Sequence, residues 1–231
     1  MTPDLPAVEV AILHETNSFR YQKGLGGLKR NDLLDRAARK FARYLAQSGK
    51  FSHTADGRKP AQRIAATGYK YCQVAENLAR HSRSVGFAAQ ELAKLAVNGW
   101  KNSPGHRRNM MQANVTEIGV GVAKTSGQHR YLSVQLFGRP QSLRYTFEIR
   151  NESRQRIKYT FSKRQSDIPG RTSIKMTVCV PGILKFQQSA RRRDGQNRPP
   201  HFKTGSGDQF VISVQNSTLF VLHRRHANQM D

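Results

Sequence analysis

The clearest pattern in the chain is the return of apolar residues every three or four positions between residues 32 and 48. Asn31 precedes this stretch and Gly49 follows it, and these residue types commonly begin and end helices. Basic side chains fill most of the opposite positions, so we predict an amphipathic helix with one buried face. That face comprises Leu34, Ala37, Ala38, Phe41, Ala42 and Leu45.

Other segments of the first 110 residues also show helical spacing. Residues 7–25 carry an apolar stripe that predicts a helix. Pro60 is expected to begin a short helix that ends at Gly68. Ser103 and Pro104 indicate the start of another short helix, in which the Ser103 hydroxyl caps backbone N–H groups. Residues 85–100 are predicted to form a second amphipathic helix. Its predicted buried side is Phe87, Ala88, Leu92, Leu95, Ala96 and Trp100.

Short apolar and alternating runs predict strands in the rest of the chain. Residues 72–81 are expected to form a strand or turn, and residues 116–125 and 129–138 a hairpin. After residue 140 only β-rich runs appear, and the basic, Pro- and Gly-rich segment 191–209 is expected to be an exposed loop. We therefore predict an α+β domain over residues 1–140 and a small all-β, sandwich-like domain over residues 141–231.

The charge is strongly positive and is spread over both halves of the chain. Lys and Arg number 39 against 15 Asp and Glu, giving a formal net charge of +24. Such a field attracts polyanions such as nucleic acids, anionic lipid headgroups and cell-surface polymers without selecting one of them. No nucleic-acid-binding motif is present, so specific nucleic-acid recognition is not expected. No apolar run approaches the roughly 18 residues of a membrane span.

Four polar residues of the first domain are candidates for a site because each lies where an apolar element begins or ends. They are His53, Glu76, His106 and Glu117. Each also has an ordinary explanation as a loop hydrogen-bond donor, a helix cap, a solvated side chain or a strand-edge charge. Two imidazoles and two carboxylates have the donor chemistry to hold a divalent ion such as Zn²⁺, or the carboxylates can instead orient the imidazoles.

The order of several motifs resembles the CAP superfamily, the SCP or cysteine-rich secretory protein, antigen 5 and pathogenesis-related 1 domain, in its bacterial form. The motifs are "FSHT", "AENLA", "WKNSPGHRRNM", "TEIGVGVA" and "YLSVQLFG", within residues 8–139. The resemblance implies an α-β-α sandwich with a small, mostly antiparallel sheet. It also implies a cleft lined by His53, Glu76 and His106, with Glu117 as the best match to the fourth position. Ser103, Arg107 and Arg108 are then expected at the rim of that cleft.

The function expected from this resemblance is binding of a divalent metal, a lipid or a peptide by an exported protein. The N-terminal residues do not form a signal peptide, so the chain is either cytosolic or, as the resemblance implies, extracellular or periplasmic with its signal removed. A metal-dependent hydrolase, most plausibly a peptidase, and a polyanion or cell-surface binder are the alternatives. Catalytic motifs such as HExxH and GxSxG are absent.

The two cysteines, Cys72 and Cys179, leave two alternatives open. They are either two buried thiols or one interdomain disulfide, and a disulfide would indicate maturation in an oxidising compartment.

Overall fold

The computed structural model describes residues 1–127, 129–187, 190–191 and 197–225, which fall into two compact units. The first unit is Met1–Ser142 and the second is Leu143–Asp231. Each unit has its own apolar core.

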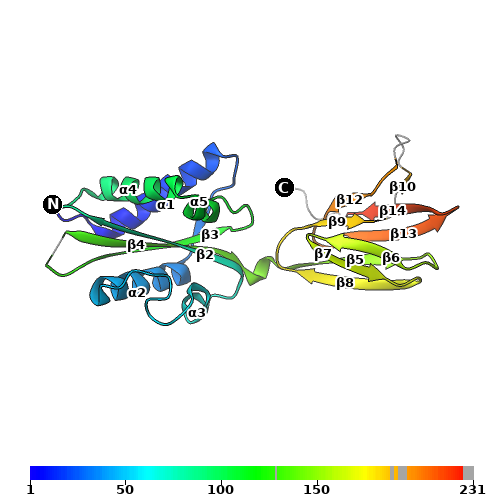
Figure 1. The fold of residues 1–231 in the computed structure, drawn as a ribbon, viewed down its shortest axis with the longest axis horizontal. Helices are drawn as coiled ribbons and strands as arrows, with labels where there is room; N and C mark the ends of the chain where they lie inside the picture. The colour runs from blue at the N-terminus through cyan, green and yellow to red at the C-terminus, as the bar shows by residue number, and fades with distance from the viewer. Residues whose placement is uncertain (128, 188–189, 192–196, 226–231) are drawn as a thin grey trace. The chain divides into compact units, whose positions relative to one another are not determined.

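The first unit is a three-layer sandwich in which one sheet separates two groups of helices (Figure 1). The strand order is β1-β3-β4-β2, with β1 parallel to β3 and the other pairs antiparallel. Helices α1, α4 and α5 cover one face, and α2 and α3 cover the other. The elements are α1 Leu5–Gln22, β1 Lys29–Arg30, α2 Asp32–Ser48, α3 Pro60–Ala65, β2 Tyr71–Ser82, α4 Ala89–Asn102, α5 Pro104–Met110, β3 Glu117–Lys124 and β4 Arg130–Pro140. The predicted α-β-α fold is confirmed.

Helix α2 has the boundaries that its end residues predict. The Asn31 side chain accepts hydrogen bonds from the N–H groups of Leu33 and Leu34, at 3.0 and 3.2 Å. Gly49 adopts φ +70°, a left-handed conformation that favours glycine at a helix end. The apolar face of α2 packs on the sheet together with Leu78 and Leu136, forming one of the two cores of this unit.

Two glycines of β3 allow α2 to approach the sheet closely. Gly119 and Gly121 lie two residues apart on the same face of the strand, and that face meets α2. A Cβ atom at Gly121 would lie 2.2 Å from the backbone nitrogen of Arg39, and one at Gly119 would lie 2.2 Å from the carbonyl carbon of Leu34. A side chain at either position would therefore push the helix away from the sheet.

The predicted buried face of α4 is wrong at two positions. Phe87, Leu92, Ala96 and Trp100 are buried as expected, but Leu95 is 37% exposed, and Ala88, the N-cap residue, is exposed as well. The helix begins only at Ala89, so the preceding apolar residues do not belong to its stripe. At 100° per residue the buried stripe also takes in Ala93 and Val97, and Leu95 falls outside it.

The second unit consists of two sheets that enclose a third apolar core, in agreement with the expected β-rich sandwich. The strand orders are β11-β10-β14-β13-β5-β8 and β12-β9-β6-β7. A short 3₁₀ helix, Gln141–Leu143, precedes these strands in the chain. The strands are β5 Tyr145–Asn151, β6 Ile157–Phe161, β7 Arg164–Ile168, β8 Thr172–Val178, β9 Ile183–Phe186, β10 Ala190–Arg191, β11 Asn197–Arg198, β12 His201–Lys203, β13 Gln209–Gln215 and β14 Thr218–Arg224.

The prediction of one exposed loop over residues 191–209 is wrong in part. His201–Lys203 form β12, which pairs with β9, because Phe202 packs against the core beside Phe186 and Phe210. The two-residue strand β11 also lies in this segment, and β10 ends at its first residue, Arg191. Residues 192–196 fall outside the described part of the chain.

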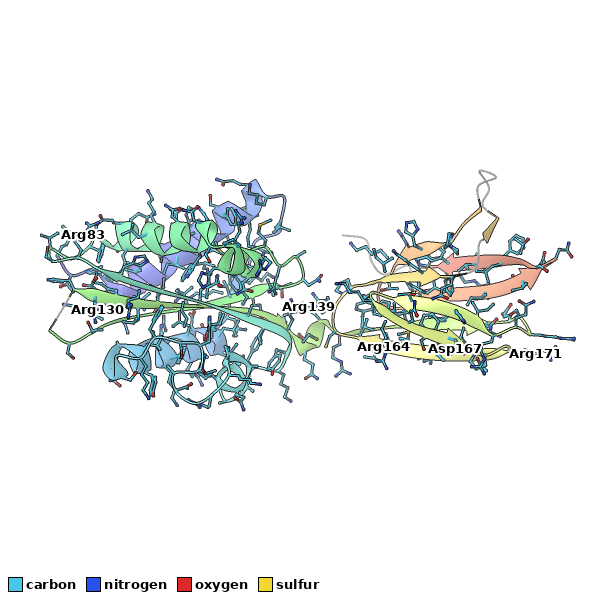
Figure 2. The ribbon with its side chains drawn as sticks, in the orientation of Figure 1. Arg83, Arg130, Arg139, Arg164, Asp167 and Arg171 are labelled. Atoms are coloured by element: carbon cyan, nitrogen blue, oxygen red, sulfur yellow. The ribbon has the colours of Figure 1, made fainter. Side chains whose placement is uncertain are left out.

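Basic side chains lie on both units, as the sequence indicates. Figure 2 labels Arg83, Arg130 and Arg139 on the first unit and Arg164 and Arg171 on the second. Among the described residues, no helix is long and apolar enough to cross a membrane.

Candidate functional site

The centre of the candidate site is Glu76, a carboxylate buried in the middle of β2. Its side chain is 1% exposed, and both oxygens have partners. Oε1 lies 2.7 Å from Nδ1 of His53, and Oε2 accepts a 2.7 Å hydrogen bond from the guanidinium of Arg63. A buried carboxylate needs such partners to offset the loss of water. The sequence-predicted pair of His53 and Glu76 therefore lies in direct contact.

Arg63, in helix α3, holds this region together. Its guanidinium also donates to Asp56 Oδ1 at 2.9 Å and to the carbonyl oxygens of Arg58 and His53 at 2.6 and 2.9 Å. It lies 3.5 Å from the centroid of the Phe41 ring, in a cation–π contact. Because one buried cation joins Glu76 to the loop that carries His53, the imidazole has little freedom to leave the carboxylate.

The charge of Asp56 is compensated within the same network. Burial alone would raise the pKa of its carboxyl group, but the hydrogen bonds from Arg58 and the charge of Arg63 outweigh burial and lower it. Asp56 therefore stays ionised and fixes both arginines.

His53 presents one ring nitrogen to the Glu76 carboxylate, and the described residues offer the other ring nitrogen no hydrogen-bond partner. Its side chain is 52% exposed. With Nδ1 against the Glu76 carboxylate, the proton belongs on Nδ1, and Nε2 is left as a lone-pair donor. This tautomer follows from the hydrogen bond and is the one that a carboxylate imposes on metal-binding histidines.

His106 is held in place by a chain of buried amides and not by its own short helix. Asn77 donates to the carbonyl oxygen of His106 at 3.2 Å and to Gln135 at 3.0 Å. Asn109 donates to Asn77 at 2.9 Å and to the Glu76 carbonyl oxygen at 3.1 Å. Gln135 in turn donates to the Thr16 hydroxyl at 2.8 Å. These contacts dock α5 on β2 and join it to α1.

The two imidazoles influence each other electrostatically. The pKa of His106 lies below its ordinary value, first because the ring is partly buried and second because the charge of His53 opposes its protonation. Protonation of His106 therefore opposes folding. This contribution to stability is complete above about pH 6.5, the unfolded value, and is lost as the pH falls through the folded value.

Removal of His53 is expected to raise the pKa of His106. The variant His53→Ala removes the second cause of the lowering and leaves the first. Titration of the imidazole proton resonances by NMR measures the change, and Ser52→Ala serves as the neighbouring control. An unchanged His106 titration in His53→Ala would show that the two rings do not interact.

Glu117 lies at the start of β3 and has a different partner. It accepts a 2.5 Å hydrogen bond from the hydroxyl of Tyr69. Burial and this bond to the carboxylate both raise the pKa of Tyr69. Glu117 also lines an open pocket with Asn31 and Lys70. The structure thus assigns the Glu117 carboxylate to Tyr69, whereas it pairs Glu76 with His53.

The expected four-residue ligand set does not fit a zinc site in which every member binds the ion. Zinc sites use free imidazole nitrogens and carboxylate oxygens in tetrahedral geometry. Both Glu76 oxygens and the Glu117 carboxylate already accept hydrogen bonds. Within the described part of the chain, no group of three or more His, Cys, Asp or Glu side chains is arranged to hold a metal ion. Of the four expected ligands, His53 and His106 are the two whose rings keep a nitrogen without a hydrogen-bond partner among the described residues.

The expected rim residues lie on or beside α5. Arg107 and Arg108 are exposed, and Ser103 occupies the N-cap position. The prediction that the Ser103 hydroxyl caps the helix is wrong, because it makes no capping hydrogen bond; its carbonyl oxygen instead accepts the first helical bond from the Arg107 N–H at 2.8 Å. Neither Cys72 nor Cys179 is a free thiol, and the bridge between them stays a prediction.

The sequence analysis does not predict the roles of three residues of the site. Arg63 and Asn109 have no local signal, because their partners lie 13 and 32 positions away. Asn77 does have a local signal. It follows Glu76 directly in a strand, so its amide points to the face of the sheet opposite to the Glu76 side chain. A polar side chain on the face toward an apolar core indicates a buried partner.

Comparison with known proteins places the first unit in a family. The sequence profile of the CAP family, described as the cysteine-rich secretory protein family, matches residues 13–137, more than half of the chain. The Bacillus subtilis protein YkwD is 28% identical over 120 residues, which cover 52% of this chain and 44% of that protein. An uncharacterized Borreliella burgdorferi protein is 32% identical over 125 residues, covering 54% of this chain and 74% of the relative.

Two solved structures of bacterial proteins resemble part of this chain. An outer surface protein from Borrelia burgdorferi has 28% identity and a TM-score of 0.47, over 56% of this chain and 90% of that chain. An extracellular protein from Bacillus anthracis with an SCP domain has 22% identity and a TM-score of 0.49, over 58% of this chain and 41% of that chain. On the profile match over residues 13–137 and the 32% identical relative, the chain belongs to the CAP, or cysteine-rich secretory protein, family.

Proposed function

We propose that this CAP protein is exported and acts by binding a ligand at the surface formed by His53 and His106, with the Glu76 carboxylate buried beneath His53. The observation that carries the proposal is the 2.7 Å contact between Glu76 and His53 Nδ1, with the carboxylate held by Arg63. A carboxylate engaged on both oxygens orients an imidazole and is poorly placed to take up a proton from water. This favours a binding role over the hydrolase alternative.

Export is supported by the relatives. One structural relative is described as an outer surface protein and another as an extracellular protein. The matched region spans less than half the length of YkwD, so functions of that whole protein are not carried over.

The first candidate ligand is a divalent cation such as Zn²⁺, bound by the two imidazoles. His53 offers Nε2, backed by the Glu76 carboxylate, and the lowered pKa of His106 favours the neutral ring that a metal requires. Two protein ligands leave coordination positions open, which a lipid headgroup or a peptide carbonyl group can fill. The polyanion alternative rests on net charge alone and stays a prediction.

A zinc titration tests this proposal. The dialysed protein and the variants His53→Ala and His106→Ala are compared by metal analysis and calorimetry with Zn²⁺. We expect each variant to weaken zinc binding at least about tenfold, since even residues that support ligands contribute 10- to 100-fold. Glu117→Gln is the control and should bind like the wild type, because Tyr69 engages that carboxylate. Equal zinc uptake by the wild type and both histidine variants would contradict the proposal.

A further inference from the structure

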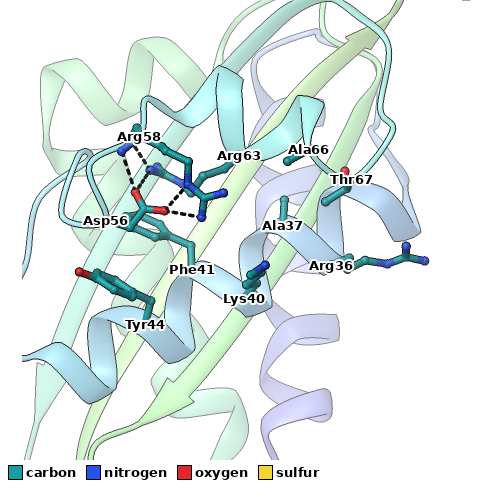
Figure 3. A pocket seen from close by; sticks show the side chains of 10 residues that line it. All are labelled: Arg36, Ala37, Lys40, Phe41, Tyr44, Asp56, Arg58, Arg63, Ala66 and Thr67. Atoms are coloured by element: carbon teal, nitrogen blue, oxygen red, sulfur yellow. Dashed lines mark hydrogen bonds and ion pairs between the residues drawn. The ribbon is translucent and has the colours of Figure 1, made fainter.

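A concave site lies on the α2 side of the sheet. It is a pocket of about 200 Å³ between α2 and the segment that runs from the 53–58 loop through α3. Figure 3 shows its two walls, with the hydrogen bonds from Arg58 and Arg63 meeting at Asp56. The lining residues are Arg36, Ala37, Lys40, Phe41, Tyr44, Asp56, Arg58, Arg63, Ala66 and Thr67.

The charge of the pocket wall is positive and incompletely balanced. Four cations and one carboxylate line it. Asp56 is bound by Arg58 and Arg63, and Arg63 is balanced further by Glu76 behind it. Arg36 and Lys40 are exposed, and the described residues offer neither of them an ion-pair partner. Two cations at one rim therefore lack counter-charges.

The inner wall of the same pocket is apolar and partly aromatic. The rings of Phe41 and Tyr44 are nearly parallel, with an interplanar angle of 10° and centroids 6.4 Å apart. Ala37 and Ala66 contribute only methyl groups, which leaves space beside these rings. An apolar cavity of about 150 Å³ is large enough to take up benzene, so a single ring fits the space available.

We propose that this pocket binds a small organic anion that carries a ring, such as an aryl carboxylate or aryl phosphate. The ring packs against Tyr44, Ala37 and Ala66, and the anionic group is bound by Lys40 and Arg36. A ring alone lacks the charge that the rim complements, and an inorganic anion alone leaves the apolar wall in contact with water. Recognition therefore requires both parts of the ligand.

Four probes separate these contributions. Phenyl phosphate and benzoate carry both parts and differ in the anionic group, benzamide carries the ring without charge, and inorganic phosphate carries charge without the ring. Binding to the full chain is followed by NMR shifts of the pocket residues and by calorimetry. We expect phenyl phosphate to bind at least fivefold more tightly than inorganic phosphate, and benzoate at least fivefold more tightly than benzamide. Equal binding of inorganic phosphate and phenyl phosphate would overturn the proposal, as would an absence of shifts at the pocket.

Two matched substitutions separate the pocket from the general field of the protein. Lys40→Gln and Arg43→Gln each remove one exposed positive charge from α2, but Arg43 does not line the pocket. We expect Lys40→Gln to weaken binding of the ring-bearing anion at least about tenfold, the lower end of the range for a hydrogen bond to a charged group. Arg43→Gln should change binding less than twofold. Equal weakening by both would show that net charge alone attracts the ligand.

A third substitution tests the ring position without changing any charge. Ala66→Leu adds an isobutyl group at the apolar wall and is expected to abolish detectable binding of phenyl phosphate and benzoate. Ala66 is exposed, so the larger side chain is compatible with folding. Unchanged binding in Ala66→Leu would overturn the ring placement.

Discussion

Replacement of Arg63 by Met is expected to lower the free energy of unfolding of the first unit by about 3–5 kcal/mol. That range is typical when one partner of a buried ion pair is removed and the other is left behind. Here Arg63 is 5% exposed and Glu76 1% exposed. The variant leaves the buried Glu76 carboxylate with His53 as its remaining side-chain partner. It also removes the hydrogen bonds that Arg63 donates to Asp56 and to the His53 carbonyl oxygen.

The measurement uses Trp100, the single tryptophan of the chain, which is 1% exposed in the core of the first unit. Its fluorescence during urea unfolding reports on this unit. Arg58→Met is the matched control: that side chain is 43% exposed and also binds Asp56, so its loss should cost less than about 1 kcal/mol. Glu76→Gln added to Arg63→Met should recover part of the stability. A loss below about 1 kcal/mol in Arg63→Met would refute the structural role given to this arginine.

Replacement of Gly121 by Ala is expected to destabilise the same unit by about 1–3 kcal/mol or more, the range for an added group in a tightly packed core. The new methyl group would lie 2.2 Å from the Arg39 nitrogen and 2.3 Å from the Ala38 carbonyl carbon, both in the backbone of α2. No side-chain rotation relieves such a contact, so the helix must move off the sheet.

Gly99→Ala is the matched control for this prediction. Gly99 lies in α4, and no heavy atom outside its own helix is within 4 Å of its would-be Cβ. Alanine there should stabilise the protein by up to about 1 kcal/mol, because it favours the helical state more than glycine does. Urea unfolding followed by Trp100 fluorescence measures both variants, and the interpretation fails if the two substitutions change stability in the same direction.

The elements that the sequence predicts well are those specified by neighbouring residues. The limits of α2 follow from Asn31, whose side chain caps the start of the helix, and from Gly49, whose left-handed conformation ends it. The assignment of Leu95 fails because, at 100° per residue, Leu95 falls outside the buried stripe of α4. The strand β12 is missed because its one inward residue, Phe202, gives no alternating signal in a basic segment.

In the candidate site too, the sequence predicts some residues and misses others. Ordered motifs point to His53, Glu76 and His106 as candidates, although Glu76 lies in the middle of β2 and not at its end. They do not identify Arg63, although it fixes the ionic state of Glu76. They also give no indication that Tyr69 binds Glu117, because that bond joins side chains 48 positions apart.

The buried amide chain from Thr16 through Gln135 and Asn77 to Asn109 has a consequence for how a ligand is received. A helix of seven residues has too few internal bonds to be stable alone, and α5 has that length. Its order therefore comes from the core, and the conformational entropy of α5 is lost during folding. A ligand bound at His106, as proposed above, would meet a surface already in its final shape, so its affinity would not be reduced by the cost of ordering α5.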